Sequence, residues 1–176
     1  MAPFEIDGPI ECYMLPDDGT AAQEDFLQHL DDPSEMYIIA YQFSFAPMVD
    51  ELLRHFAAGD PVHIYLDRLQ SRSASEKAQV QRLVANGLEV TIGTSPMGSR
   101  YICHTKGVVC LDNPPWCIEG STNFSLPAWK QVNTFNMFKS AKWADAFVTQ
   151  FKGLRHFAWT KEPKYQLMDS PPSGVT

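Results

Sequence analysis

Residues 35–45 read EMYIIAYQFSF and form the most strand-like stretch of the chain. Aromatic and β-branched side chains dominate this stretch, and both types favour the pleated, half-buried surface of a β-sheet. Residues 61–67, PVHIYLD, have the same character and begin with a proline, which is tolerated where a strand begins. We therefore predict a strand in each stretch.

Amphipathic segments alternate with these strands. Residues 48–58 carry apolar side chains at helical spacing, which predicts a helix between the first two strands. Ser73 and Glu76 form a capping box, which opens a second helix ahead of a strand at 88–92. The further expected elements are strands at 10–15, 102–111, 115–120 and 134–138 and helices opened by a Thr20–Gln23 capping box and by Ser140. Alternating strands and helices predict the α/β class.

Length and composition point to one globular domain. The 176 residues are 44% hydrophobic, which is enough for a sizeable core, and no apolar run approaches a membrane span. The N-terminus lacks the basic start of a signal peptide, and four cysteines match a reducing compartment, so we expect a cytoplasmic protein. Cys103, Cys110 and Cys117 lack a Cys-x-x-Cys pair, which favours buried thiols over a zinc site. We predict a domain at 1–160 and a flexible polar tail at 161–176.

Charge is divided unevenly along the chain. Residues 1–60 hold thirteen acids against Arg54 alone, whereas residues 61–176 hold thirteen lysines and arginines against eight acids. A basic second half can present a positive surface to a phosphate polymer despite the net charge of −7. Ordinary solvated helix faces explain the same distribution equally well.

Two short polar clusters carry the chemistry. His104 and Lys106 stand two residues apart in a predicted strand, so both are expected to project from one face of the sheet. Together they suit an anion, because lysine is a fixed cation and histidine is a nucleophile or proton donor near neutral pH. Ser121 and Asn123 follow Gly120 and are neutral hydrogen-bonding groups of the kind that hold phosphate oxygens.

The two clusters, HTKGVVCLD at 104–112 and EGSTNF at 119–124, resemble the signature of the phospholipase D superfamily. That signature is His-x-Lys, four residues, Asp, and then Gly-Ser-x-Asn. The resemblance extends over roughly residues 10–157, and the small single-motif endonucleases are the members most similar in size and plan. It implies a single α/β domain in which helices flank both faces of a mixed β-sheet.

The resemblance also implies a phosphodiesterase mechanism that uses no metal or other cofactor. His104 would attack phosphorus to form a phosphohistidine, and a second histidine would protonate the leaving oxygen. Lys106, Ser121 and Asn123 would stabilise the charge of the transition state. No other histidine of the chain is followed by Lys at the second position, so a two-fold homodimer would supply the second His104.

The chain departs from the family pattern at two positions. Asp112 lies eight residues after His104 where the family has seven, although a one-residue bulge in the strand would restore the spacing. Phe135 stands where the family has the acid that orients the histidine, while Asn133 fits the surrounding pattern. Asp112, Glu119 or a backbone carbonyl is left as the group that orients the imidazole.

Three functions follow from these observations. The first is a nuclease that cleaves DNA or RNA and has no stable membrane association. The second is a phospholipid hydrolase or transferase, for which the aromatic-rich residues 43–48 are the only sequence hint. The third is a catalytically inactive module for dimerisation or nucleic-acid binding, which the replacement of the acid by Phe135 makes plausible.

Overall fold

The computed structural model describes residues 6, 8–31, 33–98 and 100–154. The predicted domain boundary after residue 160 and the tail at 161–176 lie outside the described residues. Within them the chain forms one α/β domain, as the alternating pattern predicts. The elements in chain order are β1 (Ile10–Leu15), α1 (Gly19–His29), β2 (Met36–Ala40), α2 (Ala46–Ala58), β3 (Val62–Asp67), the 3₁₀ turn η1 (Gln70–Arg72), α3 (Ala74–Ala85), β4 (Val90–Gly93), β5 (Lys106–Cys110), β6 (Trp116–Gly120), the 3₁₀ turn η2 (Leu126–Lys130), β7 (Asn133–Lys139) and α4 (Ala141–Leu154).

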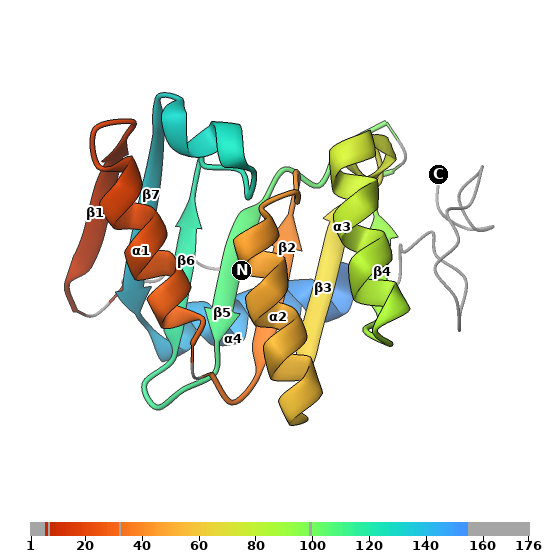
Figure 1. Cartoon of the computed structure of the whole chain (residues 1–176). Coiled ribbons are helices and arrows are strands. Elements are labelled where there is room, and N and C mark those ends of the chain that lie inside the picture. Colours follow the sequence, from red (N-terminus) through yellow and green to blue (C-terminus); the bar gives the residue numbers. More distant parts are fainter. Residues whose placement is uncertain (1–5, 7, 32, 99, 155–176) are drawn as a thin grey trace.

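The seven strands form one mixed sheet in the order β1-β7-β6-β5-β2-β3-β4. β2, β3 and β4 run parallel, and the remaining pairs are antiparallel. Helices α1, α2 and α3 cover one face of the sheet and α4 lies behind the other (Figure 1). The predicted mixed sheet with helices on both faces is therefore confirmed.

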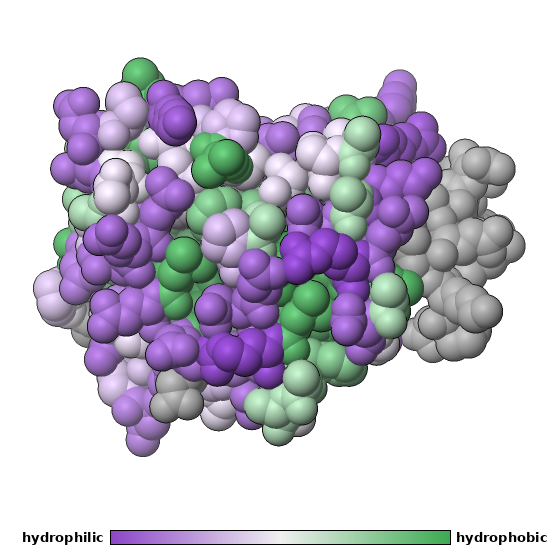
Figure 2. Space-filling model, in the orientation of Figure 1, coloured by the Kyte–Doolittle hydropathy of each residue, from purple (hydrophilic) through white to green (hydrophobic). Residues whose placement is uncertain are grey.

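Each face of the sheet has its own hydrophobic layer. Ile38, Leu66 and Val108 belong to the layer beneath α1, α2 and α3, whereas Ile39 and Tyr65 belong to the layer beneath α4. All five residues of β2 are buried because side chains on both of its faces are covered. Toward solvent, Figure 2 shows mostly hydrophilic residues over the helices of the α1–α3 face, as amphipathic helices require.

Local signals place most elements but misplace three details. Ser140 caps α4, since its Oγ accepts a hydrogen bond from Trp143 N at 3.2 Å. Helix α1 begins at Gly19 without a side-chain cap, so the capping box predicted at Thr20 is wrong. β5 begins only at Lys106 and pairs in regular register with both neighbours, which removes the first part of the strand predicted at 102–111 and the proposed bulge.

Candidate active site

Four loops meet at one edge of the sheet, the upper edge in Figure 1. β5 is antiparallel to β6 and β2, so the start of β5 lies beside the ends of those two strands. β3 is parallel to β2 and ends at the same edge. The segments that meet there are residues 41–45 after β2, 68–73 after β3, 94–98 and 100–105 before β5, and 121–125 after β6. Both polar clusters of the sequence motif therefore reach one edge.

The segment after β2 joins the two halves of the motif. Tyr41 N donates to the Thr105 carbonyl at 2.9 Å, beside the His104–Lys106 cluster. Phe124 N donates to the Gln42 carbonyl at 3.2 Å, and Ser44 N donates to the Phe124 carbonyl at 2.7 Å. Residues 41–45 thus run between the loop that carries His104 and the loop that carries Asn123.

His104 and Lys106 lie close together, but only Lys106 belongs to a strand. His104 lies exposed in the loop before β5, whereas Lys106 is the first residue of that strand and is only 6% exposed. Lys106 Nζ donates to the backbone carbonyl of His104 at 2.7 Å. The ring of Tyr41 lies 4.5 Å from the His104 ring and 5.0 Å from Lys106 Nζ, measured to the ring centroids. The two side chains are close together, as the sequence predicts. They do not share one face of a strand, because His104 lies outside β5.

The surroundings of His104 favour its neutral form. Partial burial lowers the pKa of the imidazole, and the neighbouring Lys106 charge lowers it further, while Asp67 opposes both. Burial likewise lowers the pKa of Lys106. A neutral imidazole has a lone pair free to attack an electrophile, so this environment suits a nucleophile.

Ser121 is positioned by the neighbouring strand β7. Its Oγ donates to Asn133 Oδ1 at 3.1 Å and accepts from Thr134 N at 2.9 Å. The glycine before it is required by close backbone approach, because a Cβ at Gly120 would lie 2.3 Å from the Thr134 carbonyl oxygen. Asn133 therefore supports Ser121, which is the place the structure gives to this predicted residue.

The side chain of Asn123 has an amide oxygen that is available to bind a ligand. Its Oδ1 atom is buried and has no hydrogen-bond partner among the described residues. A buried amide oxygen left without a partner is costly, so such atoms commonly await a ligand, an ion or water. The free capacity lies on the same loop as Ser121, where the motif predicts contact with a phosphate.

The structure does not bring Asp112 to this edge. Asp112 follows β5, whereas His104 precedes it, and Asp112 lines a small cavity with His29 and Trp116. Glu119 lies opposite Gly107 on β5, and its carboxylate accepts a hydrogen bond from Asn136 Nδ2 at 2.9 Å. The hydrogen bonds found among the described residues include none to the His104 imidazole.

Other sequence hints belong to the core. Phe43, Phe45 and Met48 are buried, so the aromatic segment proposed as a lipid contact packs inside the domain. Phe135 packs against Phe26 and Trp129, with ring centroids 5.5 and 5.1 Å away. Cys103, Cys110 and Cys117 are buried free thiols, as predicted. No described set of His, Cys, Asp or Glu residues has the arrangement of a metal site.

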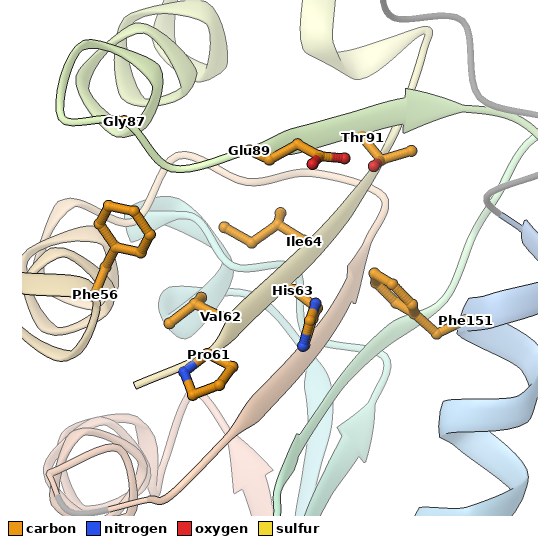
Figure 3. A pocket seen from close by; sticks show the side chains of 9 residues that line it. All are labelled: Phe56, Pro61, Val62, His63, Ile64, Gly87, Glu89, Thr91 and Phe151. Atoms are coloured by element: carbon orange, nitrogen blue, oxygen red, sulfur yellow. The ribbon is translucent and has the colours of Figure 1, made fainter. Parts of the chain in front are cut away.

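A cavity of about 290 Å³ lies away from this edge, at the start of β3 (Figure 3). Pro61, His63, Glu89 and Phe151 are among the residues that line it. The His63 Nε2 atom pairs with Glu35 Oε1 at 3.0 Å. The opposite end of β3, at Asp67, reaches the edge that carries His104. His63 therefore does not belong to the candidate site.

Sequence reasoning missed three residues at the site edge. Tyr41 contacts both motif residues, but nothing in an apolar strand pattern distinguishes its ring from core aromatics. Asp67 ends β3 and is 1% exposed. The sequence pattern places Glu76 in a capping box, and Ser73 Oγ does accept from Glu76 N at 3.4 Å, but the Glu76 carboxylate accepts from Phe43 N at 2.7 Å. Cys103, which bonds the Asp67 carboxylate, and Phe43, which bonds that of Glu76, come from distant parts of the chain.

The buried Glu76 makes stability depend on pH. Burial raises its pKa from 4.5 to about 8, so between these values the folded protein holds a proton that the unfolded chain has released. Its contribution to stability is therefore full below pH 4.5 and is lost as the pH rises toward 8. We expect Glu76→Gln, which cannot ionise, to be more stable than wild type at pH 8.5 by ~3 kcal/mol beyond any difference at pH 5.5.

Urea unfolding at the two pH values measures this difference. The control is Glu24→Gln, which alters an exposed acid of α1 and should leave the pH dependence unchanged. An equal effect of Glu76→Gln at both pH values would contradict the raised pKa.

The amino-acid sequence of this protein matches that of a known protein family. Residues 27–155 match the family model described as the cardiolipin synthase, PLD-like domain. The match covers well over half of the chain, so the protein belongs to the phospholipase D superfamily, as the motif predicts. No curated protein sequence matches it significantly.

Solved structures show the same fold. Nuc from Salmonella typhimurium, a phospholipase D family member, has a TM-score of 0.74 at 19% identity, over 90% of this chain and 98% of its own. NucT from Helicobacter pylori has a TM-score of 0.74 at 14% identity, over 85% of this chain and 97% of its own. TrmBL2, an archaeal chromatin protein with a novel mode of DNA binding, has a TM-score of 0.57 at 13% identity, over 86% of this chain and 54% of its own.

Proposed function

We propose that the protein is a metal-independent phosphodiesterase that cleaves nucleic acid through a phosphohistidine at a dimer-interface site. The observation that carries the proposal is the exposed His104, whose pKa is lowered, beside a buried lysine at the edge where Asn123 has a free amide oxygen. Family membership supports a phosphodiesterase-type hydrolase. No described helix is long and apolar enough to cross a membrane.

The proposed reaction has two steps. A neutral ring nitrogen of His104 attacks phosphorus, the bond from phosphorus to the leaving oxygen breaks, and a second histidine donates a proton to that oxygen. The same second histidine then takes a proton from water, whose oxygen attacks phosphorus and displaces His104. Lys106, Ser121 and Asn123 stabilise the phosphoryl oxygens in both steps.

A second copy of the chain is proposed to supply the second histidine. His29 contacts Trp116 and the buried His55 bonds the Leu30 carbonyl, so neither is placed to help His104. Exposed apolar side chains surround the His104 loop, and large exposed apolar groups suit a surface that another chain covers. These residues are Leu69, Met97, Tyr101 and Ile102, between 42 and 78% exposed.

Nucleic acid is favoured over lipid as the substrate. Arg68 and Arg72 follow β3 directly, at the edge that carries His104. Gln70, which lies between them in sequence, donates from Nε2 to Tyr41 Oη at 3.0 Å and so ties this loop to the site. Cationic side chains beside a phosphodiester site suit a polyanion, and the DNA-binding TrmBL2 shares the fold.

The family description keeps a phospholipid as the alternative substrate, since it names a cardiolipin synthase domain. The experiment that tests the proposal is a panel of single- and double-stranded DNA, RNA and anionic phospholipid vesicles. Cleavage of nucleic acid supports the proposal, headgroup release from vesicles supports the alternative, and no turnover of any substrate favours the inactive module.

Cleavage is expected to persist in excess EDTA. The proposed nucleophile is an imidazole, and lysine and neutral hydrogen-bond donors supply the stabilisation that a metal ion would otherwise give. The measurement compares initial rates on the best substrate with and without chelator. Loss of the activity in EDTA and its return on adding magnesium or zinc would contradict this mechanism.

Light scattering at micromolar concentration is expected to give about twice the chain mass of 19.8 kDa. Ile102→Asp should produce monomers and abolish cleavage, because it places a charge on the proposed interface. Ile10→Asp is the matched control, since Ile10 is 47% exposed against 42% for Ile102 but lies on the edge strand β1. A wild-type monomer with full activity would overturn the dimer.

A further inference from the structure

Asp67 is a buried carboxylate that the proposed mechanism does not use. It ends β3, is 1% exposed, and lies at the edge of the sheet where His104 emerges. Its Oδ2 accepts from Cys103 N at 2.7 Å and its Oδ1 accepts from Leu69 N at 2.8 Å. The residue that it fixes, Cys103, immediately precedes His104.

We propose that Asp67 is a positioning residue for His104, which holds the backbone of the nucleophile loop and places a negative charge behind the His104–Lys106 pair. This inference rests on the proposed role of His104 as nucleophile. In this role Asp67 acts on the reaction through neighbouring residues and does not contact the substrate.

Asp67 anchors the His104 loop from the β3 side. His104 is exposed and outside regular structure, so its position depends on contacts made by its neighbours. Lys106 Nζ binds the His104 carbonyl, and the Tyr41 ring lies against the imidazole. On the amino-terminal side, Cys103 N–H is held by Asp67, a bond that joins residues 36 positions apart. A charge-assisted bond of this kind is stronger than a bond between neutral groups.

The charge of Asp67 acts on the same step. N–H groups directed at a carboxylate favour its ionised form, and those of Cys103, Leu69 and Gln70 oppose the effect of burial, which raises the pKa of Asp67. The Asp67 charge raises the pKa of His104 and that of Lys106, against the lowering by burial. When neutral His104 bonds to phosphorus its ring becomes cationic, so a fixed anion behind the ring stabilises the intermediate.

Several other titratable groups lie near the Asp67 carboxylate and also interact with its charge. They are Tyr65 on β3, Arg68 after it, Glu76 on α3, Cys103 in the loop and Lys106 on β5, while the Tyr41 ring after β2 faces His104 itself. Glu76 is the most informative for comparison. It is also a buried acid that holds a backbone N–H, but with a pKa raised to about 8 it carries little charge at pH 7 and does not contribute to the pKa shift of His104.

The test is an NMR titration of the His104 ring in wild type, Asp67→Asn and Glu76→Gln. Asp67→Asn should lower the pKa of His104 and shift the acidic limb of the cleavage profile to lower pH. It should also reduce kcat by about tenfold, because the nucleophile is less well placed. Glu76→Gln should leave the His104 titration unchanged. An unchanged His104 pKa in Asp67→Asn overturns the inference.

If Asp67→Asn does not fold, a second measurement on the wild-type protein tests whether Asp67 interacts with His104. Coupling between two titrating groups is mutual, so in wild type the Asp67 carboxyl carbon signal should show a step at the pH where His104 titrates. The step should vanish in His104→Asn, and its absence in wild type overturns the inference. Cleavage by His104→Asn at the wild-type rate would instead refute the proposed function, whatever Asp67 does to the titration.

Discussion

His104→Asn is expected to reduce cleavage by about 10³-fold or more while leaving the fold and the dimer intact. Asparagine is close to histidine in bulk and His104 is exposed, so the substitution costs little stability. Only the imidazole can form the covalent bond to phosphorus, and no other described histidine lies at this edge.

The matched control is His63→Asn, which changes a half-buried histidine beside the cavity at the start of β3. It should cleave at the wild-type rate once its lower stability is taken into account. Initial rates at saturating substrate, with melting curves for each variant, make the comparison. Wild-type cleavage by His104→Asn would show that His104 is not the nucleophile.

Lys106→Met is expected to reduce kcat by about 10²-fold or more. Methionine keeps most of the buried volume of the lysine side chain but removes the charge beside the developing phosphoryl negative charge. It also removes the hydrogen bond from Nζ to the His104 carbonyl, so the loop that carries the nucleophile loses one of its contacts.

Lys139→Met provides a control of the same chemistry. Lys139 Nζ lies 4.7 Å from the centroid of the Trp116 ring, as Lys106 Nζ lies 5.0 Å from that of Tyr41, but Trp116 is at the start of β6, away from the site edge. Equal losses of kcat in the two variants would point to a general effect of charge and not to a role for Lys106 in the site.

The sequence predicts the layers of this fold because burial follows the periodicity. The stretch at 35–45 gives β2, although the strand ends at Ala40 and residues 41–45 form a loop, and the helical stripe of Trp143, Phe147, Phe151 and Leu154 gives α4. Strands and helices of this kind are determined by which side chains must leave water, and that information is local. Motif spacing likewise brings His104, Lys106, Ser121 and Asn123 to one edge.

The local pattern fails where a distant side chain decides the backbone. Residues 102–105 have the composition of a strand, but Cys103 N–H bonds the Asp67 carboxylate and the strand begins only at Lys106. Glu76 has the spacing of a capping residue, but its carboxylate reaches Phe43 instead. These partners lie 36 and 33 residues away in sequence, so no local window contains them.

Detection of a covalent intermediate on His104 is the most direct test of the proposed mechanism. The wild-type protein is mixed with a short oligonucleotide that it cleaves, quenched without acid within one turnover, digested and examined by mass spectrometry. We expect the peptide containing His104 to gain the mass of the phosphoryl-linked fragment, and the corresponding peptide of His104→Asn to gain nothing. An adduct on another residue, or none at His104 during rapid turnover, would contradict the proposed mechanism.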